Sequence, residues 1–296
     1  MILVSGGTGF IGRHVVARLA ASGEPVRVAA RGSRTADLPP GVEQIKADVT
    51  SGEGLAAAMV GVDRAAHLVG VIVERGGQGF DAVIHGGTGN IVHEAEKAGV
   101  KKLVYVSAIG AAPDPKFPYW HAKWQAEQVI AQSKLNYTIL RPSLVFGPED
   151  DFFNRLARLI RRAPLTPIAG NGRSRFQPIW VEDVVSCVVA CLGEETHDRE
   201  VVEIGGPEQY TYDELIDLIG NELGKRRPKV HMPLWLMRPA ARVMQSFLSS
   251  PPVTTDQLAM LSKDNTTALD AVPRAFGFAP RSLRQGLSHL RERPAA

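Results

Sequence analysis

The first half of the chain alternates short apolar runs with stretches in which apolar residues recur every three or four positions. Short apolar runs predict buried parallel strands, and the helical spacing predicts amphipathic helices between them. The predicted strands cover residues 2–4, 26–30, 42–47, 65–69, 103–106 and 137–140, and the predicted helices cover 11–22, 55–60, 88–98 and 120–133. Strands that alternate with helices indicate an α/β fold with a parallel sheet.

The pattern changes after Pro148. An amphipathic helix is predicted at 151–162, a Pro/Gly-rich break at 163–172, a helix at 182–192, a late strand returning to the sheet at 201–204 and a helix at 212–223. From Arg227 onward we expect helical pieces separated by prolines. We therefore place a first domain at residues 1–148, with the returning strand added, and a smaller, mostly helical C-terminal substrate lobe at 149–296.

The composition is globular, with 44% hydrophobic and 22% charged residues among 296. The net charge of +3 gives no electrostatic footprint for nucleic acid, so we expect no such partner. No apolar run approaches the ~18 residues that span a bilayer, and no targeting segment is visible. These features predict a cytoplasmic protein.

Cysteine and histidine give no sign of a redox or metal centre. Cys187 and Cys191 lie four apart in an apolar stretch, which predicts buried reduced thiols on one helix face rather than a redox or metal pair. The eight histidines show no metal-binding spacing, so we expect no metal site.

Three glycines, Gly6, Gly9 and Gly12, stand between the first predicted strand and helix. Glycine permits a tight turn, close approach of a pyrophosphate and close packing of the helix on the strand, and the helix N-terminus favours an anion. The position predicts nucleotide binding in a Rossmann-type doubly wound parallel sheet; the alternative is a merely structural turn. The cofactor-binding residues expected here are Gly6, Thr8, Gly9, Phe10, Ile11 and Gly12.

The end of the second predicted strand bears on the choice of cofactor. An acidic residue there favours NAD, whereas arginine pairs with the 2′-phosphate of NADP. Arg31 and Arg34 stand there, and no acidic residue occurs between Val26 and Thr35. We therefore expect NADP(H), with NAD(H) as the alternative if both arginines are solvated loop residues.

Ser107, Tyr119 and Lys123 are the candidate catalytic residues. Tyr119 and Lys123 are four apart, hence on one helix face, and Ser107 ends the fifth predicted strand at the ligand-binding edge of the sheet. A nearby ammonium would lower the pKa of Tyr119 and let it exchange a proton near neutral pH, while Ser107 bonds the reacting oxygen. The alternative is a structural or vestigial pair, because the spacing also arises by chance.

These residues resemble the short-chain dehydrogenase/reductase superfamily, in its extended or atypical branch. The motifs that carry the resemblance are Gly6–Gly12, Asp48, His67–Gly70, Val106–Ala108, Tyr119 with Lys123, and Arg141–Pro148. The resemblance implies that Asp48 contacts the adenine, that Lys123 also binds the nicotinamide ribose, and that Val69 and Gly70 line the cofactor. It further implies a cofactor-binding role for Val49, Pro142 and Val145.

Within this branch, three segments are similar to relatives of the nucleotide-binding accessory subunit of respiratory complex I: Gly147–Asn154, Gln177–Val184 and Thr255–Leu258. In those relatives the nucleotide is expected to be structural. Extended members often carry Asn where this chain has Ile84, and the gap from Ser107 to Tyr119 is shorter than in many sugar-nucleotide epimerases. Both departures argue against a sugar-nucleotide substrate.

The stretch 234–248 is the candidate for contact with a membrane or membrane complex. Its apolar positions at helical spacing are Trp235, Leu236, Ala240, Val243, Met244 and Phe247, with Arg238 and Arg242 between them. A basic amphipathic helix with Trp can lie at a membrane surface, peripheral to its inner face. The alternative is a helix of the second lobe packed on its own core.

Two functions therefore stay open. The first is an NADP(H)-dependent oxidoreductase acting on an unidentified carbonyl or alcohol. Its substrate is expected to be apolar if the aromatic residues Trp120, Trp124, Phe152, Phe153 and Trp180 line the pocket, although they could equally be core residues. The second is a non-catalytic NADPH-binding structural or assembly protein of a respiratory or quinone-linked membrane complex. One fold hosts many functions, so the fold does not decide between them.

Overall fold

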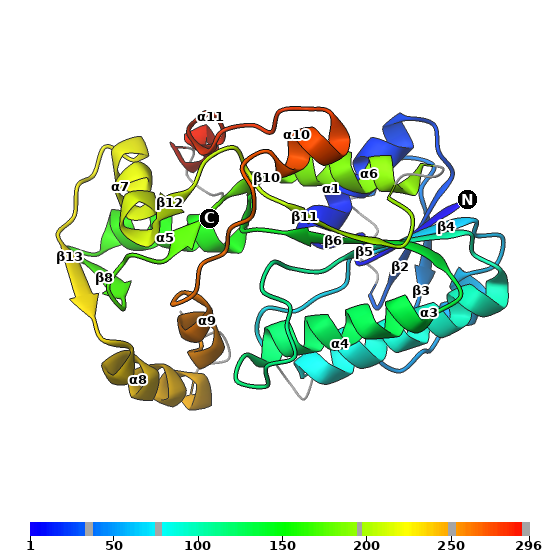
Figure 1. The fold of residues 1–296 in the computed structure, drawn as a ribbon, viewed down its shortest axis with the longest axis horizontal. Coiled ribbons are helices and arrows are strands. Elements are labelled where there is room, and N and C mark those ends of the chain that lie inside the picture. The colour runs from blue at the N-terminus through cyan, green and yellow to red at the C-terminus, as the bar shows by residue number, and fades with distance from the viewer. Residues whose placement is uncertain (33–37, 75–78, 194–196, 248–252, 292–296) are drawn as a thin grey trace. The chain divides into compact units, whose positions relative to one another are not determined.

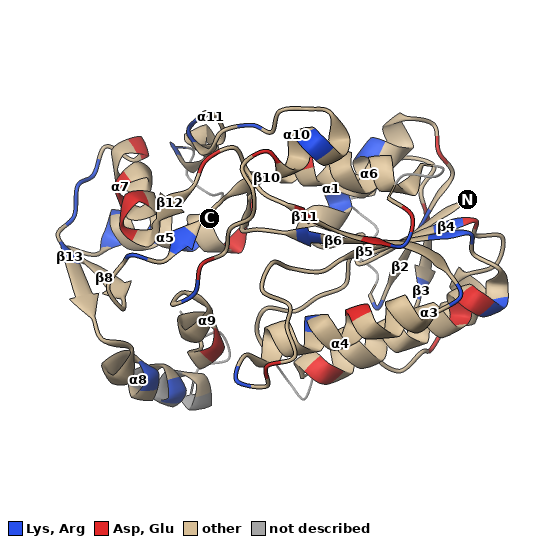
Figure 2. Ribbon diagram, in the orientation of Figure 1, with Lys and Arg blue, Asp and Glu red and all other residues tan. Residues whose placement is uncertain are grey.

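The chain forms two compact units in the computed structural model, which describes residues 1–32, 38–74, 79–193, 197–247 and 253–291. The first unit consists of Met1–Pro142 with Glu182–Glu203, and the second of Ser143–Val181 with Ile204–Ala296. Arg34 lies outside the described residues. Charged residues of both signs occur in each unit (Figure 2), in keeping with the small net charge.

The first unit is built on a seven-stranded sheet in the order β11-β6-β5-β4-β1-β2-β3. The strands are β1 Ile2–Ser5, β2 Val26–Ala30, β3 Glu43–Lys46, β4 Arg64–His67, β5 Lys102–Val106, β6 Asn136–Pro142 and β11 Glu200–Ile204. The pairs from β3 to β6 are parallel. The predicted doubly wound α/β fold is confirmed.

Helices cover both faces of this sheet. Helices α3 (Gly87–Ala98) and α4 (Pro118–Gln132) lie on one face, and α1 (Phe10–Ala21) and α6 (Val181–Leu192) on the other (Figure 1). A short helix α2, Leu55–Ala58, and a π-helical segment, Asp81–Gly86, complete the unit; the latter extends α3 toward the N-terminus beyond the predicted start. Cys187 and Cys191 are buried free thiols on α6, as predicted.

The strand order fixes where a ligand meets the sheet. The chain leaves β1 toward β2 on one side and later returns to β4 on the other, so α1 after β1 and α3 after β4 lie on opposite faces of the sheet. In open α/β sheets such a switch point is the ligand-binding crevice. The glycine loop follows β1, and residues 68–70 follow β4.

The boundary between the units differs from the predicted one at residue 148. The structure divides the chain at Pro142/Ser143 and returns all of Glu182–Glu203 to the first unit, not only a strand. The reason is that α6 is tied to α1: Glu182 accepts from Arg18 at 2.7 Å and contacts the His14 ring at 2.5 Å. The following β11 then pairs beside β6 at the sheet edge.

The second unit contains helices and short strand pairs. Helices α5 Asp151–Arg162 and α7 Tyr212–Glu222 occur as predicted, followed by α8 Leu234–Phe247, α9 Thr255–Met260, α10 Ala271–Phe276, α11 Leu283–Gly286 and the 3₁₀ segment Leu287–Arg291. The strand pairs are β7 Val145–Phe146 with β10 Ile179–Trp180, β9 Arg175–Phe176 with β12 Tyr210–Thr211, and β8 Thr166–Ala169 with β13 Lys229–Met232.

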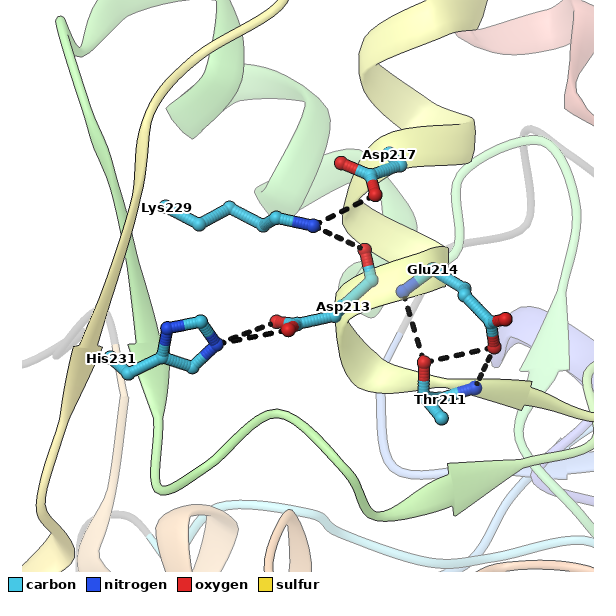
Figure 3. A network of polar contacts seen from close by, with 6 residues as sticks. All are labelled: Thr211, Asp213, Glu214, Asp217, Lys229 and His231. Carbon is cyan, nitrogen blue, oxygen red and sulfur yellow. Dashed lines mark hydrogen bonds and ion pairs between the residues drawn. The ribbon is translucent and has the colours of Figure 1, made fainter.

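Strand β8 lies within the predicted Pro/Gly-rich break at 163–172, and β13 lies within the tail where mainly helical pieces were expected. Strand β13 pairs in parallel with β8, and its side chains also contact α7 (Figure 3): Lys229 donates to Asp217 at 2.7 Å, and the His231 ring lies 2.9 Å from Asp213. Thr211 and Glu214 close the start of α7 with a reciprocal capping box. Both its strand partner and these polar partners are distant from β13 in the sequence.

Gly12 allows a direct test of the packing between the glycine loop and α1. A Cβ added there would lie 2.0 Å from the Gly6 carbonyl oxygen, so Gly12→Ala is expected to lower the free energy of unfolding by about 3 kcal/mol. Gly89→Ala is the control, because a Cβ there meets nothing within 4 Å and alanine favours the helix. Urea unfolding of both variants checks this; a Gly12→Ala protein as stable as Gly89→Ala would contradict it.

Candidate functional site

The glycine loop presents an open helix N-terminus. Gly6 has a φ of +79°, and its carbonyl accepts from the Gly9 amide at 3.0 Å, which closes the turn. Thr8 and Gly9 are exposed, α1 begins after Gly9 without a side-chain cap, and its first turn holds no acidic residue. Because nothing bulkier fits at Gly12, the backbone itself forms the cradle. These residues fit a pyrophosphate, which would meet amides and the positive end of the helix.

The residues expected to bind the adenosine part of the cofactor differ in how exposed they are and in which groups they contact. Arg31 is exposed just after β2. The Asp48 carboxylate accepts from the Thr50 amide at 2.8 Å, so its Oδ1 is already bonded to the backbone of the turn that follows β3. Val49 is buried, and its carbonyl accepts from the Asn90 side chain at 2.8 Å. Phe10 and Ile11 are half-buried at the start of α1.

The structure brings Gly70 and Lys123 together. A Cβ at Gly70 would lie 3.4 Å from the Lys123 Nζ, and Gly70 itself is exposed in the loop after β4. Val69 packs against the core of the first unit. Pro142 ends β6 in the first unit, whereas Val145 lies on β7 of the second, and their cofactor roles stay predictions.

Lys123 extends from α4, and its buried amine lies at the end of β5. Its Nζ donates to the Val106 carbonyl at 2.7 Å and lies 4.8 Å from the centre of the Tyr105 ring. Burial lowers the pKa of Lys123 to about 7, although the nearby Glu127 carboxylate opposes this change. The amine therefore exchanges its proton near neutral pH.

Tyr119 differs from the expectation. We predicted that the ammonium lowers its pKa, but burial raises the pKa of Tyr119 to about 12. The ring packs edge-on against Phe80, and the amine of Lys123 is engaged with Val106. Desolvation thus dominates, and at neutral pH the phenol keeps its proton.

Ser107 is hydrogen-bonded to Glu127, which is in turn paired with Arg141. Neither partner was predicted as a site residue. The Ser107 Oγ donates to Glu127 at 2.5 Å, and Glu127 also accepts from Arg141 Nε at 2.9 Å and Nη2 at 2.6 Å. Glu127 is 2% exposed. The missed signal is its spacing: Glu127 follows Lys123 by four residues, so it shares the helix face of the candidate pair.

Residues 6–154, a span of half the chain, match the family described as NAD(P)H-binding. The chain belongs to the NAD(P)H-binding family. This confirms the predicted nicotinamide dinucleotide cofactor, whereas the preference for NADP stays a prediction.

Two relatives and one solved structure show which kinds of protein this NAD(P)H-binding chain is similar to. It is 26% identical over 283 residues to the mitochondrial NADH dehydrogenase (ubiquinone) 1 alpha subcomplex subunit 9 of Arabidopsis thaliana, covering 90% of this chain and 68% of that protein. It is 27% identical over 239 residues to the ceramide reductase of Caulobacter vibrioides, covering 79% of this chain and 74% of that protein. The UDP-glucuronic acid 4-epimerase of Bacillus cereus, solved with UDP-glucuronic acid and NAD, superposes with a TM-score of 0.77 at 20% identity over 98% of this chain and 97% of that one.

The predicted resemblance to extended short-chain dehydrogenases/reductases and to complex I subunit relatives is confirmed by these matches. The likeness to the epimerase shows the fold alone, because its identity is low. No member of the comparison decides which of the candidate site residues act in this chain.

A buried histidine joins the two strands at the switch point of the NAD(P)H-binding unit. Thr88 donates its hydroxyl to the Ile84 carbonyl at 2.5 Å, so its oxygen accepts from His67 Nε2 at 3.1 Å, and His67 Nδ1 accepts from Ser5 at 2.7 Å. Burial, followed by the charge of Lys123, lowers the pKa of His67 to about 3. The neutral ring therefore links the ends of β1 and β4 to Thr88 of α3, which in turn bonds Ile84 of the π-helical segment.

The aromatic residues considered as a substrate lining are mostly core residues. Trp120 is 6% exposed and Phe153 fully buried. Phe152 and Trp180 pack against the core of the second unit. The structure therefore favours the core alternative for these four, and Trp124 lies beside the His121 ring.

Lys123 makes the stability of the first unit depend on pH. An unfolded chain keeps a lysine pKa near 10.5, so between pH 7 and 10.5 it binds a proton that native Lys123 has lost, and stability rises with pH in this window. Lys123→Met is expected to stabilise the protein at pH 6 by on the order of 3 kcal/mol, with the gain shrinking toward pH 10.

Thermal unfolding at several pH values measures this gain. Lys116→Met makes the same change on an exposed side chain and is expected to leave the pH profile as it is. A Lys123→Met gain that grows with pH would contradict the burial argument.

Proposed function

We propose that this chain is an NADPH-dependent oxidoreductase that interconverts the carbonyl and alcohol forms of an apolar substrate. The observation that carries the proposal is the buried, titratable Lys123 beside Gly70, one helical turn from Tyr119 and adjoining the end of β5 where Ser107 stands. A bound nicotinamide would supply a hydride to the carbonyl carbon. Tyr119 would give the carbonyl oxygen its proton, which completes the alcohol.

The protonation of the site at neutral pH is the one from which a carbonyl reduction starts. With its pKa raised to about 12, Tyr119 is protonated at neutral pH and is a proton donor, not a base. Lys123, with a pKa of about 7, can hold or release a proton at the same pH and would stabilise the phenolate that forms. The name of the Caulobacter relative, a ceramide reductase, supports reduction of a lipid-like substrate.

The proposal of NADPH over NADH depends on Arg31. Its side chain is exposed directly after β2, where a guanidinium can pair with the 2′-phosphate by charge-assisted hydrogen bonds.

A second candidate is a nucleotide-binding structural subunit peripheral to a membrane complex. One observation favours it: Trp235 is 74% and Leu236 48% exposed on α8, while Leu234 and Ala241 face the small core beneath. The basic positions Arg238 and Arg242 lie on the same exposed side as Trp235 at helical spacing, a pattern suited to anionic lipid headgroups.

The relative from Arabidopsis, named as a subunit of NADH dehydrogenase, agrees with this second candidate. The side chains of Ala240, Val243, Met244 and Phe247, and residue 248, lie outside the described residues. Within the described ranges, no helix has both the length and the apolar character needed to cross a bilayer. A structural subunit would hold its nucleotide without exchange, whereas an enzyme must release it in every turnover.

Tyr119→Phe tests the proposed chemistry. Loss of the phenolic proton is expected to reduce carbonyl reduction at least ~100-fold while NADPH binding stays unchanged. NADPH oxidation with a panel of aliphatic and aromatic ketones gives the rate, and NADPH fluorescence gives the binding. Tyr137→Phe, the same change at a buried tyrosine of β6, is the control. Full activity in Tyr119→Phe would exclude the mechanism.

Arg31→Glu tests the cofactor preference. The reversed charge is expected to weaken NADPH binding at least ~10-fold, which is about 1.4 kcal/mol, and to weaken NADH binding less. Titration calorimetry with both dinucleotides measures the two affinities. Arg173→Glu makes the same charge change at an exposed position of the second unit. Equal losses for NADPH and NADH would refute the role of Arg31.

A further inference from the structure

Glu127 is the most deeply buried carboxylate near the candidate catalytic residues. It lies on α4 four residues after Lys123 and eight after Tyr119, so the three share one helix face. Only 2% of its surface is exposed. A buried charge of this kind is costly unless it is paired and hydrogen-bonded, so its partners explain its presence.

The partners of Glu127 are all donors. Arg141 reaches it from the end of β6 through Nε at 2.9 Å and Nη2 at 2.6 Å, a two-pronged contact. The third donor is the Ser107 hydroxyl at 2.5 Å. The contact with Glu127 raises the pKa of Arg141 further, and a carboxylate paired with a guanidinium only accepts hydrogen bonds.

The direction of the Ser107 hydrogen bond follows from this pairing. A serine hydroxyl carries one proton, and here that proton points to Glu127. The Ser107 oxygen keeps only lone pairs for any other partner. The backbone fixes its place, since the Ser107 amide donates to the Leu140 carbonyl at 2.7 Å.

We propose that Glu127 is a positioning residue of the site: clamped by Arg141, it takes the Ser107 hydrogen bond and leaves the Ser107 oxygen as an acceptor for a reacting hydroxyl. This rests on the proposed oxidoreductase function. Ser107 then accepts a hydrogen bond from the hydroxyl of the alcohol form, and it donates nothing to a carbonyl. Tyr119 is left as the donor to the carbonyl oxygen, which replaces the expectation that Ser107 bonds the reacting oxygen of the carbonyl.

The same carboxylate acts on Lys123. The ionisable or aromatic groups around this amine are Tyr119 and Glu127 on α4, Tyr105 on β5 and His67 on β4. Glu127 raises the pKa of Lys123 against the effect of burial, and it provides the negative charge in this set. Removing that charge while Arg141 stays should lower the Lys123 titration midpoint.

Glu127→Gln and its control Glu203→Gln separate a positioning role from a structural one. Glu203 lies 3.8 Å from Arg141 Nη1 and is 40% exposed, so it offers the same charge change beside the same arginine. NMR titration of the Lys123 amine is expected to show a midpoint lower by about one pH unit in Glu127→Gln and little change in Glu203→Gln. Equal midpoints in the wild type and Glu127→Gln would overturn the influence on Lys123.

Neutron diffraction from the wild-type protein in D₂O tests the direction of the Ser107 hydrogen bond. It needs no variant, so the proposal can be tested even if the Glu127→Gln protein does not fold. The expected result is a deuteron on Ser107 Oγ directed at Glu127. A deuteron directed elsewhere would overturn the proposal. Neither measurement depends on turnover, so an active Tyr119→Phe protein would refute the proposed function while these results stand.

Discussion

Helix α1 crosses the first turn of the chain so closely that no side chain fits between them. The position of a Cβ at Gly12 lies 2.0 Å from the Gly6 carbonyl oxygen, and one at Gly6 lies 2.9 Å from the backbone of Leu68 and Val69. This contact sets the distance from α1 to β1 and brings the loop after β4 against the glycine turn. The exposed amides at the start of α1 and the residues after β4 therefore meet at the switch point of the sheet.

The charges beyond this crevice are arranged by burial. Lys123 and Glu127 are both withdrawn from water on one face of α4, and each is satisfied by a group at the end of a neighbouring strand: the Val106 carbonyl and the Arg141 guanidinium. Desolvation disfavours the ammonium and the phenolate, whereas the carboxylate opposes it at Lys123. The pKa values of Lys123 and Tyr119 thus depend on how deeply α4 buries them and on the groups that the neighbouring strand ends place beside them.

The sequence predicts the first unit better than the second for a physical reason. Central strands such as β1 and β5 contain consecutive buried apolar residues, and the longer helices have apolar residues at helical spacing, so both patterns appear locally. Two-residue strands such as Val145–Phe146 have no period, and β13 forms by pairing with β8, which lies some sixty residues earlier in the chain. Contacts between distant residues leave no local pattern.

The same limit applies to the candidate site. The spacing of Tyr119 and Lys123 and the position of Ser107 are visible in the sequence, but their ionisation is not, because it depends on burial. The expected lowering of the Tyr119 pKa was wrong for this reason. Glu127 could be found from its helix face alone, whereas its pairing with Arg141 requires β6 to lie beside β5.

The buried charged groups also help to distinguish the two proposed functions. Holding a dinucleotide needs the glycine turn, an open helix N-terminus and groups for the ribose, and none of these requires a buried lysine. Apolar residues of similar volume in place of a buried ion pair are often as stable or more so, which makes Glu127 and Arg141 poor choices for stability alone. A titratable amine at Lys123, a protonated phenol at Tyr119 and an oriented hydroxyl at Ser107 are what proton transfer beside a nicotinamide requires. The energetic cost of burying these groups is therefore in keeping with a proton-transfer role at the end of β5, and a merely structural role leaves that cost without an explanation.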